Sequence, residues 1–271
     1  MHTNRLVEYA PPVRIAVCVK SVPDAGSART IESGTKRLDR SADAVLNPYD
    51  ANAIEEALRL NETSGEGEVV LVSLGPEKAL DALRKGLAMG ADRVVLVSDE
   101  AAIGSDLVAT SYALAKALER EDADLVLFGQ QGSDSDGAVL WAAVADRLRR
   151  PLISQVAELT VSDSTITGKR QTENGYDTIQ APLPAVVAVT DAINEPRYPS
   201  LKGIMGAKKK PQDVVSLSDI GADATRAGEA GSRTTVMTLS PPPPRGDSKK
   251  IEDDGSAAAA IVAFLEEKKL L

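Results

Sequence analysis

The sequence predicts an α/β fold, in which a parallel β-sheet is covered by helices on both faces. Short apolar runs rich in β-branched residues alternate with longer amphipathic stretches, an order that is typical of right-handed βαβ units. The runs are apolar at successive positions, as expected for strands buried on both faces. With 271 residues and 43% hydrophobic content, the chain can form one large core.

Before Pro151, strands and helices are predicted to alternate along the chain. The strands are expected at residues 14–20, 68–74, 93–97 and 124–129. The helices are expected at residues 48–61, 76–89, 105–118 and 135–148. Pro48 and Pro76 suit first helical positions, and Ser105 suits an N-cap.

Beyond Pro151 the pattern predicts a small β-rich insertion. Strands are expected at residues 158–161, 165–170 and 183–190. Asn174-Gly175 readily adopts the positive φ angles of a hairpin turn. Residues 194–210 are rich in proline, glycine and charge without a regular period, so we expect a long loop there.

The C-terminal part is predicted to be an extended arm. A proline- and charge-rich linker at residues 240–256 precedes a helical stretch with an apolar face, residues 256–270. Such a face is expected to pack on the body of the protein or on another chain. The expected organisation is an N-terminal extension (1–13), an α/β domain (14–215) and the arm (216–271).

Composition excludes several classes of function. The net charge of −9 argues against nucleic acid or an anionic membrane as the main partner. Cys18 is the only cysteine, which excludes an internal disulfide and indicates a reducing compartment. His2 is the only histidine, which removes most histidine-based catalysis and metal binding. No stretch approaches the ~20 apolar residues of a membrane helix, and the start lacks a signal-peptide apolar region. We therefore expect a cytoplasmic protein without direct membrane insertion.

The most informative local feature is the loop GQQGSDSDG, residues 129–137, which follows one predicted strand and precedes a helix. Ligands of parallel sheets gather at the carboxyl ends of strands, and a helix N-terminus offers N–H groups to phosphate. A capped surface turn is an equally good interpretation of these residues alone. The chain lacks a Walker loop and a Gly-x-Gly-x-x-Gly fingerprint, which argues against the usual nicotinamide binding.

The turn Asn47-Pro48-Tyr49-Asp50 precedes the first long helix. Its residues favour simple helix capping, with Asn47 as the N-cap and Pro48 as the first helical residue. A role in ligand binding is the alternative, because this turn is expected near the same end of the sheet.

Four segments resemble the beta subunits of electron-transfer flavoproteins. They are RIAVCVKSVPD (14–24), NPYDANAIEEALRL (47–60), GLAMGADRVVLV (86–97) and the long composite signature LPAVVAVTDAINEPRYPSLKGIMGAKKK (183–210). The resemblance covers roughly residues 14–217. It implies a Rossmann-like fold of the adenine-nucleotide alpha-hydrolase type, making residues 14–215 a nucleotide-binding domain.

The same resemblance implies a heterodimer with an alpha subunit that holds most of the FAD. Electrons would come from dehydrogenases such as acyl-CoA dehydrogenase and pass to a quinone oxidoreductase. The beta subunit would bind a structural AMP. Its contacts would be Cys18, Asn47, Pro48, Tyr49, Asp50, Leu74, Gly129, Gln130, Gln131, Gly132, Ser133, Asp134, Ser135, Asp136, Gly137, Ala138, Val139 and Leu140, with Cys18 and Leu74 contributing mainly backbone.

The family's partner-recognition loop would consist of Asn194, Glu195, Pro196, Arg197, Tyr198, Pro199, Ser200, Leu201 and Lys202. Leu201 would be its apolar anchor in a pocket of the dehydrogenase. An ordinary proline-rich loop is the alternative interpretation. The chain departs from many family members at Val139-Leu140, where they carry Gln-Thr, and at Gly206, where lysine is usual.

We therefore expect an electron-carrier subunit with no catalytic residue and no metal site of its own. One alternative is the beta subunit of an NADH-dependent, electron-bifurcating flavoprotein, in which a second FAD replaces AMP. The sequences KSVPD and NPYD favour that type, whereas NEPRYPSL favours the dehydrogenase-coupled type. An alternative of another class is a stand-alone adenine-nucleotide-binding regulator or hydrolase.

Overall fold

The computed structural model describes residues 13–65, 67–244, 250 and 253–271. Two compact units are present, one ending at Thr235 and the other comprising Val236–Leu271. Nearly all of the expected N-terminal extension (1–13), including His2, lies outside the described residues, as does part of the expected linker.

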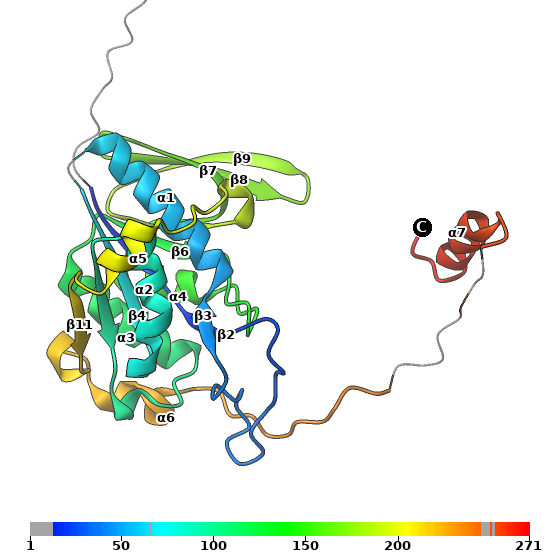
Figure 1. Ribbon diagram of the computed structural model, residues 1–271, viewed down its shortest axis with the longest axis horizontal. Helices are drawn as coiled ribbons and strands as arrows, with labels where there is room; N and C mark the ends of the chain where they lie inside the picture. Colours follow the sequence, from blue (N-terminus) through cyan, green and yellow to red (C-terminus); the bar gives the residue numbers. More distant parts are fainter. Residues whose placement is uncertain (1–12, 66, 245–249, 251–252) are drawn as a thin grey trace, which may run out of the picture. The chain divides into compact units, whose positions relative to one another are not determined.

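One sheet dominates the first unit, and within the described residues it contains nine strands in the order β11-β5-β4-β1-β6-β10-β7-β8-β9 (Figure 1). Its strands are β1 (Arg14–Cys18), β4 (Glu68–Leu74), β5 (Arg93–Val97), β6 (Leu125–Gly129), β7 (Leu152–Ser162), β8 (Thr165–Thr172), β9 (Gly175–Pro182), β10 (Ala185–Val189) and β11 (Gln212–Val215). All pairs from β11 to β7 are parallel, and β8 and β9 are antiparallel. The predicted α/β class with a mostly parallel sheet is confirmed.

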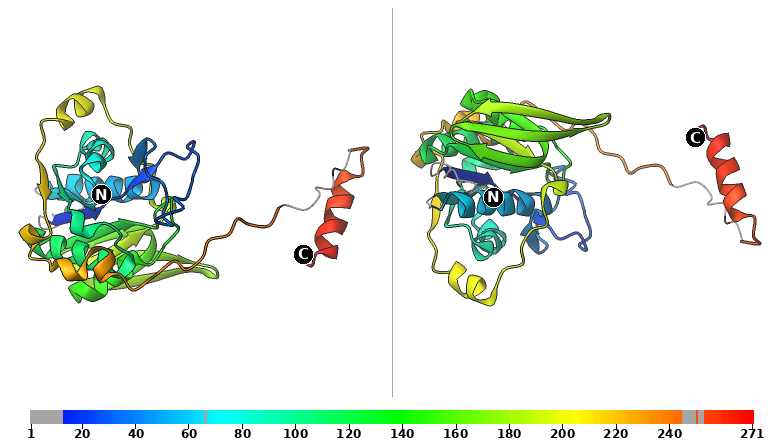
Figure 2. Two further views of the ribbon diagram at one scale, coloured as in Figure 1. Left: turned by 90° about the horizontal axis from the view of Figure 1, so that it is seen from below. Right: turned by 90° about the horizontal axis from the view of Figure 1, so that it is seen from above.

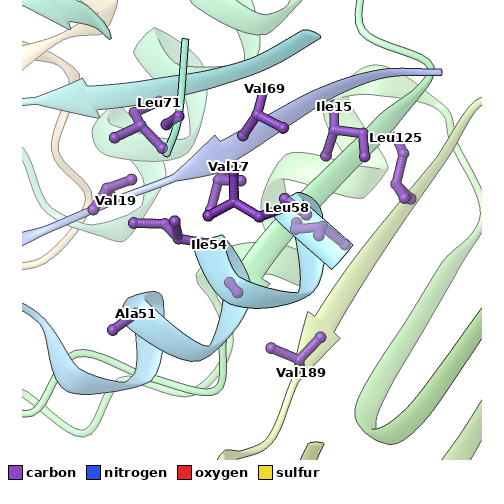
Figure 3. Packing of buried hydrophobic residues seen from close by; sticks show 14 of the residues in the cluster. Ile15, Val17, Val19, Ala51, Ile54, Leu58, Val69, Leu71, Leu125 and Val189 are labelled. Carbon is purple, nitrogen blue, oxygen red and sulfur yellow. The ribbon is translucent and has the colours of Figure 1, made fainter. Parts of the chain in front are cut away.

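Helices cover both faces of this sheet. Helices α1 (Pro48–Ser64) and α2 (Leu80–Met89) share one core cluster with Ile15 and Val17, whereas α3 (Leu107–Glu121) and α4 (Leu140–Leu148) share another with Ala16 and Cys18. Successive residues of β1 therefore point to opposite faces, and both faces are buried. Figure 3 shows Ile54 and Leu58 of α1 beside the apolar side chains of β1 and β4.

The expected β-rich insertion is a continuation of the main sheet. Strand β7 begins at Leu152, earlier than the predicted 158, because Ile153 and Val156 are buried beside β10. Its outer half pairs with β8, and a two-residue turn leads into β9. The turn residues are Glu173 and Asn174, one position earlier than expected, because Thr172 pairs with Gly175, and only Gly175 has a positive φ, +136°. Figure 2 shows these strands in green at one edge of the sheet.

Several short elements were not predicted. They are β2 (Ser21–Pro23), β3 (Ala44–Leu46), β11, α5 (Leu201–Ala207), α6 (Gly228–Gly231) and the 3-10 helices η1 (Glu77–Ala79), η2 (Glu100–Ala102), η3 (Asp191–Ile193), η4 (Ser218–Ile220) and η5 (Ala224–Arg226). Within the expected loop 194–210, α5 begins where Ser200 Oγ accepts a hydrogen bond from the Gly203 N–H at 3.0 Å. A side chain on Gly203 would collide with the Ala88 carbonyl, so glycine lets α5 pack closely on α2.

The compact unit extends beyond the expected boundary at residue 216. Leu217, Ile220 and Ala227 are buried in the cluster that contains α3 and α4. These three buried side chains hold residues 217–227 on the first unit, although the sequence there has no regular period. The second unit carries α7 (Ala257–Glu267), whose described side chains include no buried residue. Among the described residues, no helix is long and apolar enough to cross a membrane.

Candidate functional site

The topology creates a switch point at the carboxyl end of the sheet, and we call the region between the loops that follow β1 and β6 the crevice. Strand β1 lies between β4 and β6, and the chain leaves β1 toward α1 on one face and β6 toward α4 on the other. Ligands of open α/β sheets bind at such a switch point, because the loops diverge there. Cys18, Leu74 and Gly129 end the three neighbouring strands, so the structure brings these predicted site residues to one edge.

Asn47 joins the turn before α1 to the loop after β6. Its Nδ2 donates a hydrogen bond to the Gln131 carbonyl at 2.8 Å, and its Oδ1 accepts one from the Ser133 N–H at 3.1 Å. The residue is buried and occupies the N-cap position of α1, yet its side chain makes no capping bond. The capping interpretation is therefore wrong for this side chain, because the glycine-rich loop uses both of its polar atoms.

Asp50, in the first turn of α1, binds the segment that follows β1. The Lys20 N–H donates to its carboxylate at 2.7 Å. Burial raises the pKa of Asp50 to about 7, although hydrogen bonds and charge from Lys20, Asn47 and Gly129 act in the opposite direction. Residue 129 must be glycine here, because a Cβ would overlap the backbone of Tyr49 and the Asp50 carboxylate.

Cys18 is the last residue of β1 and is buried. Burial, and secondarily the charge of Asp50, raise the pKa of its thiol well above the ordinary value. A thiol that stays protonated is a poor nucleophile. The structure therefore supports the expectation that Cys18 can contribute packing and backbone rather than chemistry.

The loop between β6 and α4 is longer than predicted. The Ser135 and Asp136 N–H groups both donate to the Gly132 carbonyl, at 3.1 and 2.8 Å, and Asp136 has φ +47°. A helix was expected to begin at residue 135, but residues 132–136 form these hydrogen-bonded turns instead. Helix α4 therefore begins at Leu140. Among the described residues, the N–H groups of Gly137 and Leu140 donate no hydrogen bond. Unpaired donors at the start of a helix suit an anion.

Two basic residues converge on this loop. Lys20 Nζ donates to Asp134 Oδ1 at 2.7 Å, and Arg40 bonds the other oxygen of the same carboxylate. The Asp134 side chain is only 1% exposed. Burial raises its pKa, but the hydrogen bonds and charges of Lys20 and Arg40 outweigh burial and lower the pKa overall. Asp134 is therefore ionised and neutralised by two cations.

The remaining predicted contact residues differ in their exposure to solvent. Pro48, Ser135, Asp136, Gly137 and Val139 are exposed. Partial burial is shared by Tyr49, Leu74, Gln130, Gln131, Gly132, Ser133, Ala138 and Leu140. Trp141 donates from its indole N–H to the Gln130 carbonyl at 3.1 Å, which fixes the loop against α4.

Sequence reasoning missed Lys20 and Arg40 as site residues. Lys20 is the last residue of the predicted strand 14–20, so its position at the carboxyl edge of the sheet was a usable signal. Arg40 belongs to a long segment between β2 and β3 that has no regular period. Only the folded chain places that arginine beside Asp134.

The predicted recognition loop, residues 194–202, is fixed to α1. Asn52 Nδ2 donates to the Asn194 carbonyl at 2.8 Å, and Asn194 Nδ2 donates to the Asn52 carbonyl at 3.1 Å. Arg197 forms ion pairs with Glu55 at 2.7 Å and Glu62 at 2.5 Å. The backbone of this loop is therefore held before any partner binds.

An exposed apolar patch continues from this loop into α5. Its members are Tyr198, Leu201, Ile204 and Met205, and we call them the recognition patch. Tyr198 is 92% exposed and Leu201 76% exposed. Large apolar side chains gathered on a fixed surface are typical of protein contacts.

Residues 35–220 match the family model described as the electron transfer flavoprotein domain. The chain belongs to this family. This electron-transfer flavoprotein chain is 41% identical over 233 residues to the electron transfer flavoprotein subunit beta of Mycobacterium tuberculosis H37Rv, covering 84% of this chain and 88% of the relative. The subunit beta of Mycobacterium leprae is 43% identical over 235 residues with the same coverage. A protein of Acetobacterium woodii named caffeyl-CoA reductase-Etf complex subunit CarD is 36% identical over 225 residues, covering 83% of this chain and 86% of the relative.

The resemblance to electron-transfer flavoprotein beta subunits is thus confirmed. Membership assigns the chain to flavin-linked electron transport as a carrier component. Within the described part of the chain, no group of histidine, cysteine, aspartate and glutamate side chains could hold a metal ion.

Proposed function

We propose that this chain binds AMP in the crevice and forms a heterodimer with an alpha subunit that holds most of the FAD. The heterodimer accepts electrons from a dehydrogenase, with acyl-CoA dehydrogenases as the favoured class, and delivers them to a quinone oxidoreductase. The observation that carries the proposal is the two-sided hydrogen bond of Asn47 to the loop after β6. That bond joins two segments at the switch point of the sheet, the region where ligands of open α/β sheets generally bind.

The residues of the crevice supply groups that suit the phosphate of an adenosine monophosphate. The Gly137 and Leu140 N–H groups at the start of α4 supply donors for the phosphate, with the positive end of the helix dipole behind them. Lys20 supplies the nearest positive charge, with 40% of its side chain exposed. Val139 and Leu140 lack the hydroxyl and amide that many relatives carry, so backbone N–H groups and the hydroxyls of Ser133 and Ser135 would replace them.

The bound AMP has a structural role in this proposal. It would connect the ends of β1 and β6 with the turn before α1, adding to the hydrogen bonds that Asn47 and Asp50 already make between these segments. FAD, when bound, accepts and donates the electrons. The residues of this chain bind, orient and exclude water around the cofactors, which is what a protein contributes to electron transfer.

The recognition patch would dock the dehydrogenase. Leu201 stands at the first position of α5, behind the Ser200 cap. Because Arg197 and Asn194 already fix the loop to α1, little conformational entropy is lost when Leu201 enters a pocket. The exposed lysines Lys202 and Lys208 flank the patch and favour a partner surface with acidic residues.

A second FAD in place of AMP, with NADH as donor, is the alternative function. It is favoured by the 36% identity to a protein named as a subunit of a caffeyl-CoA reductase-Etf complex. The two cations at the loop, Lys20 and Arg40, would also suit a diphosphate. A stand-alone regulator or hydrolase fits less well, because the relatives are named as subunits and no histidine base lies among the described residues.

Counting flavins separates these functions. The full chain is co-expressed with a candidate alpha subunit, and flavin is quantified by absorbance after extraction from the purified complex. One FAD per heterodimer is expected, and two would support the bifurcating alternative. A chain that forms no complex with alpha subunits and hydrolyses ATP alone would contradict the heterodimer.

A further inference from the structure

The loop after β6, residues 129–140, contains two acidic residues and no basic one. The acidic residues are Asp134 and Asp136. The positive charges of the crevice come instead from Lys20, which follows β1, and Arg40, which precedes β3. Within the described part of the chain, both cations form their ion pairs with Asp134 alone, one with each carboxylate oxygen. The formal charges of these four side chains therefore cancel.

Asp134 lies buried between the two cations. Its side chain is 1% exposed, whereas those of Lys20 and Arg40 are 40% and 46% exposed. A Cβ at Gly132 would lie 2.9 Å from Asp134 Oδ1 and 3.2 Å from Lys20 Nζ, so this ion pair packs directly against the loop backbone. A carboxylate bound by lysine and arginine makes the charge-assisted hydrogen bonds that a phosphate would make there. The two cations are therefore already paired before a ligand phosphate arrives.

The unpaired N–H groups that suit the nucleotide phosphate begin close to Asp134. Gly137 follows it by three positions, so the two Cα atoms are at most about 11 Å apart. Burial raises the pKa of Asp134, but Lys20 and Arg40 outweigh burial and lower the pKa overall, so the carboxylate is ionised. Salt screens charges over about 8–10 Å, and it screens buried charges less. A phosphate at Gly137 therefore meets N–H donors together with a buried negative charge.

Adenine nucleotides differ in the charge that they would bring to this loop. The phosphate of AMP carries about −1.5 to −2 at pH 7, and each further phosphate of ADP and ATP adds about one negative charge. This added charge would be repelled by Asp134, while Lys20 and Arg40 are already paired. Placing like charges together is how binding sites reject a wrong ligand. The two phosphates of FAD carry about one negative charge each, so FAD does not exceed the charge of AMP.

We propose that Asp134 is the specificity-determining residue of the crevice, which accepts AMP and rejects ADP and ATP. The inference rests on the proposed adenine-nucleotide site and names the charge class of the nucleotide that the site takes. Asp134 acts in two ways, because it neutralises both cations and repels a further phosphate. The bound AMP keeps its structural role, since the limit concerns only which nucleotide enters.

The test compares Asp134→Asn with Asp122→Asn, which make the same change of charge near opposite ends of β1. Asp134 pairs with Lys20 and Asp122 pairs with Arg14, both at 2.7 Å. The affinities of the full chain for AMP and for ADP are measured by calorimetry without magnesium. We expect the wild type and Asp122→Asn to bind AMP at least about tenfold more tightly than ADP. Asp134→Asn should bind the two nucleotides within about threefold of each other.

Arg40→Gln provides a second test in the opposite direction, and it decides the question even if Asp134→Asn does not fold. It removes a half-exposed cation and leaves Asp134 paired with Lys20, so the preference for AMP over ADP should exceed that of the wild type. Equal affinity of the wild type for AMP and ADP, or a preference that neither variant changes, would overturn the inference and leave the nucleotide site intact. A wild-type chain that binds no adenine nucleotide would instead contradict the proposed function, and the inference would fail with it.

Discussion

One buried amide, Asn47, holds the turn before α1 against the loop after β6. Replacing it with alanine would leave the Gln131 carbonyl and the Ser133 N–H without partners, at a cost of about 1–3 kcal/mol for each buried group. We expect Asn47→Ala to weaken AMP binding at least about tenfold, as measured by calorimetry.

Asn61 provides the matched control for this prediction. It lies near the other end of α1, and its buried Oδ1 has no hydrogen-bond partner. Asn61→Ala removes an amide from the same helix without disturbing the crevice. AMP affinity should match the wild type, and equal losses in both variants would show that Asn47 acts only through general stability.

Asp50 should make stability depend on pH. Its pKa rises from the model-peptide value of 3.8 to about 7 in the folded chain, chiefly through burial. The folded state therefore favours the protonated form, and the stability that Asp50 contributes is full below pH 4 and is lost as pH rises to 7. Three units at 1.36 kcal/mol each set an upper limit of about 4 kcal/mol.

Asp50→Asn removes this titration while keeping a similar shape. Urea denaturation at several pH values should show a steeper fall in stability for the wild type than for the variant between pH 4 and 7. The difference between the two curves isolates Asp50 from other titrating groups such as Glu56, whose pKa burial also raises. If stability fell equally with pH in the wild type and in Asp50→Asn, the pH dependence would not come from Asp50.

Helix α1 connects the two candidate binding surfaces. Its first turn carries Asp50 at the crevice, and Glu55 and Glu62 hold Arg197 of the recognition loop. We expect Arg197→Gln to raise the KM of the dehydrogenase reaction about tenfold, because the loop must then be ordered during docking. AMP content should not change.

Arg59 offers a control on the same helix. It also pairs with Glu55, at 2.8 Å, but contacts no residue of the recognition loop. Arg59→Gln should leave the KM unchanged and lower stability by less than about 1 kcal/mol, because the Arg59 side chain is half exposed and the buried Glu55 keeps Arg197 as a partner. An equal rise of KM in both variants would show that loop ordering is not the cause.

The elements that sequence predicted best were those whose pattern is local. Strands such as β4 and β6 are continuous apolar runs, so their burial on two faces was evident. Strand β11 and helix α5 are short and depend on contacts with β5 and α2, which no local period encodes. The start of α4 was misplaced because the turns after Gly132 use the same polar residues as a helix cap.

In the candidate site, too, local features were predictable from the sequence and contacts between distant residues were not. The glycine-rich loop and the turn at Asn47 were identified from their positions after and before predicted elements. The bond between them was not, because it joins residues 84 positions apart. The contact between Arg40 and Asp134, at a separation of 94, was equally hidden.

The chain consists of a folded first unit and a second unit, Val236–Leu271, which we propose binds the alpha subunit. The last buried apolar contacts of the body lie at Ile220 and Ala227, before the division at Thr235. We expect a chain ending at Thr235 to keep the melting temperature of the full chain and its affinity for AMP. Its affinity for the alpha subunit should fall at least about a hundredfold, because the apolar face of α7 is lost. A large drop in melting temperature would show instead that the arm stabilises the body.

The central claim is that the crevice at the ends of β1 and β6 is an adenine-nucleotide site. The most direct measurement is mass spectrometry of the nucleotides released from the purified heterodimer. We predict one AMP for each copy of this chain, and its loss in Asn47→Ala. A heterodimer that carries flavin but releases no adenine nucleotide beyond the FAD of the alpha subunit would contradict the account.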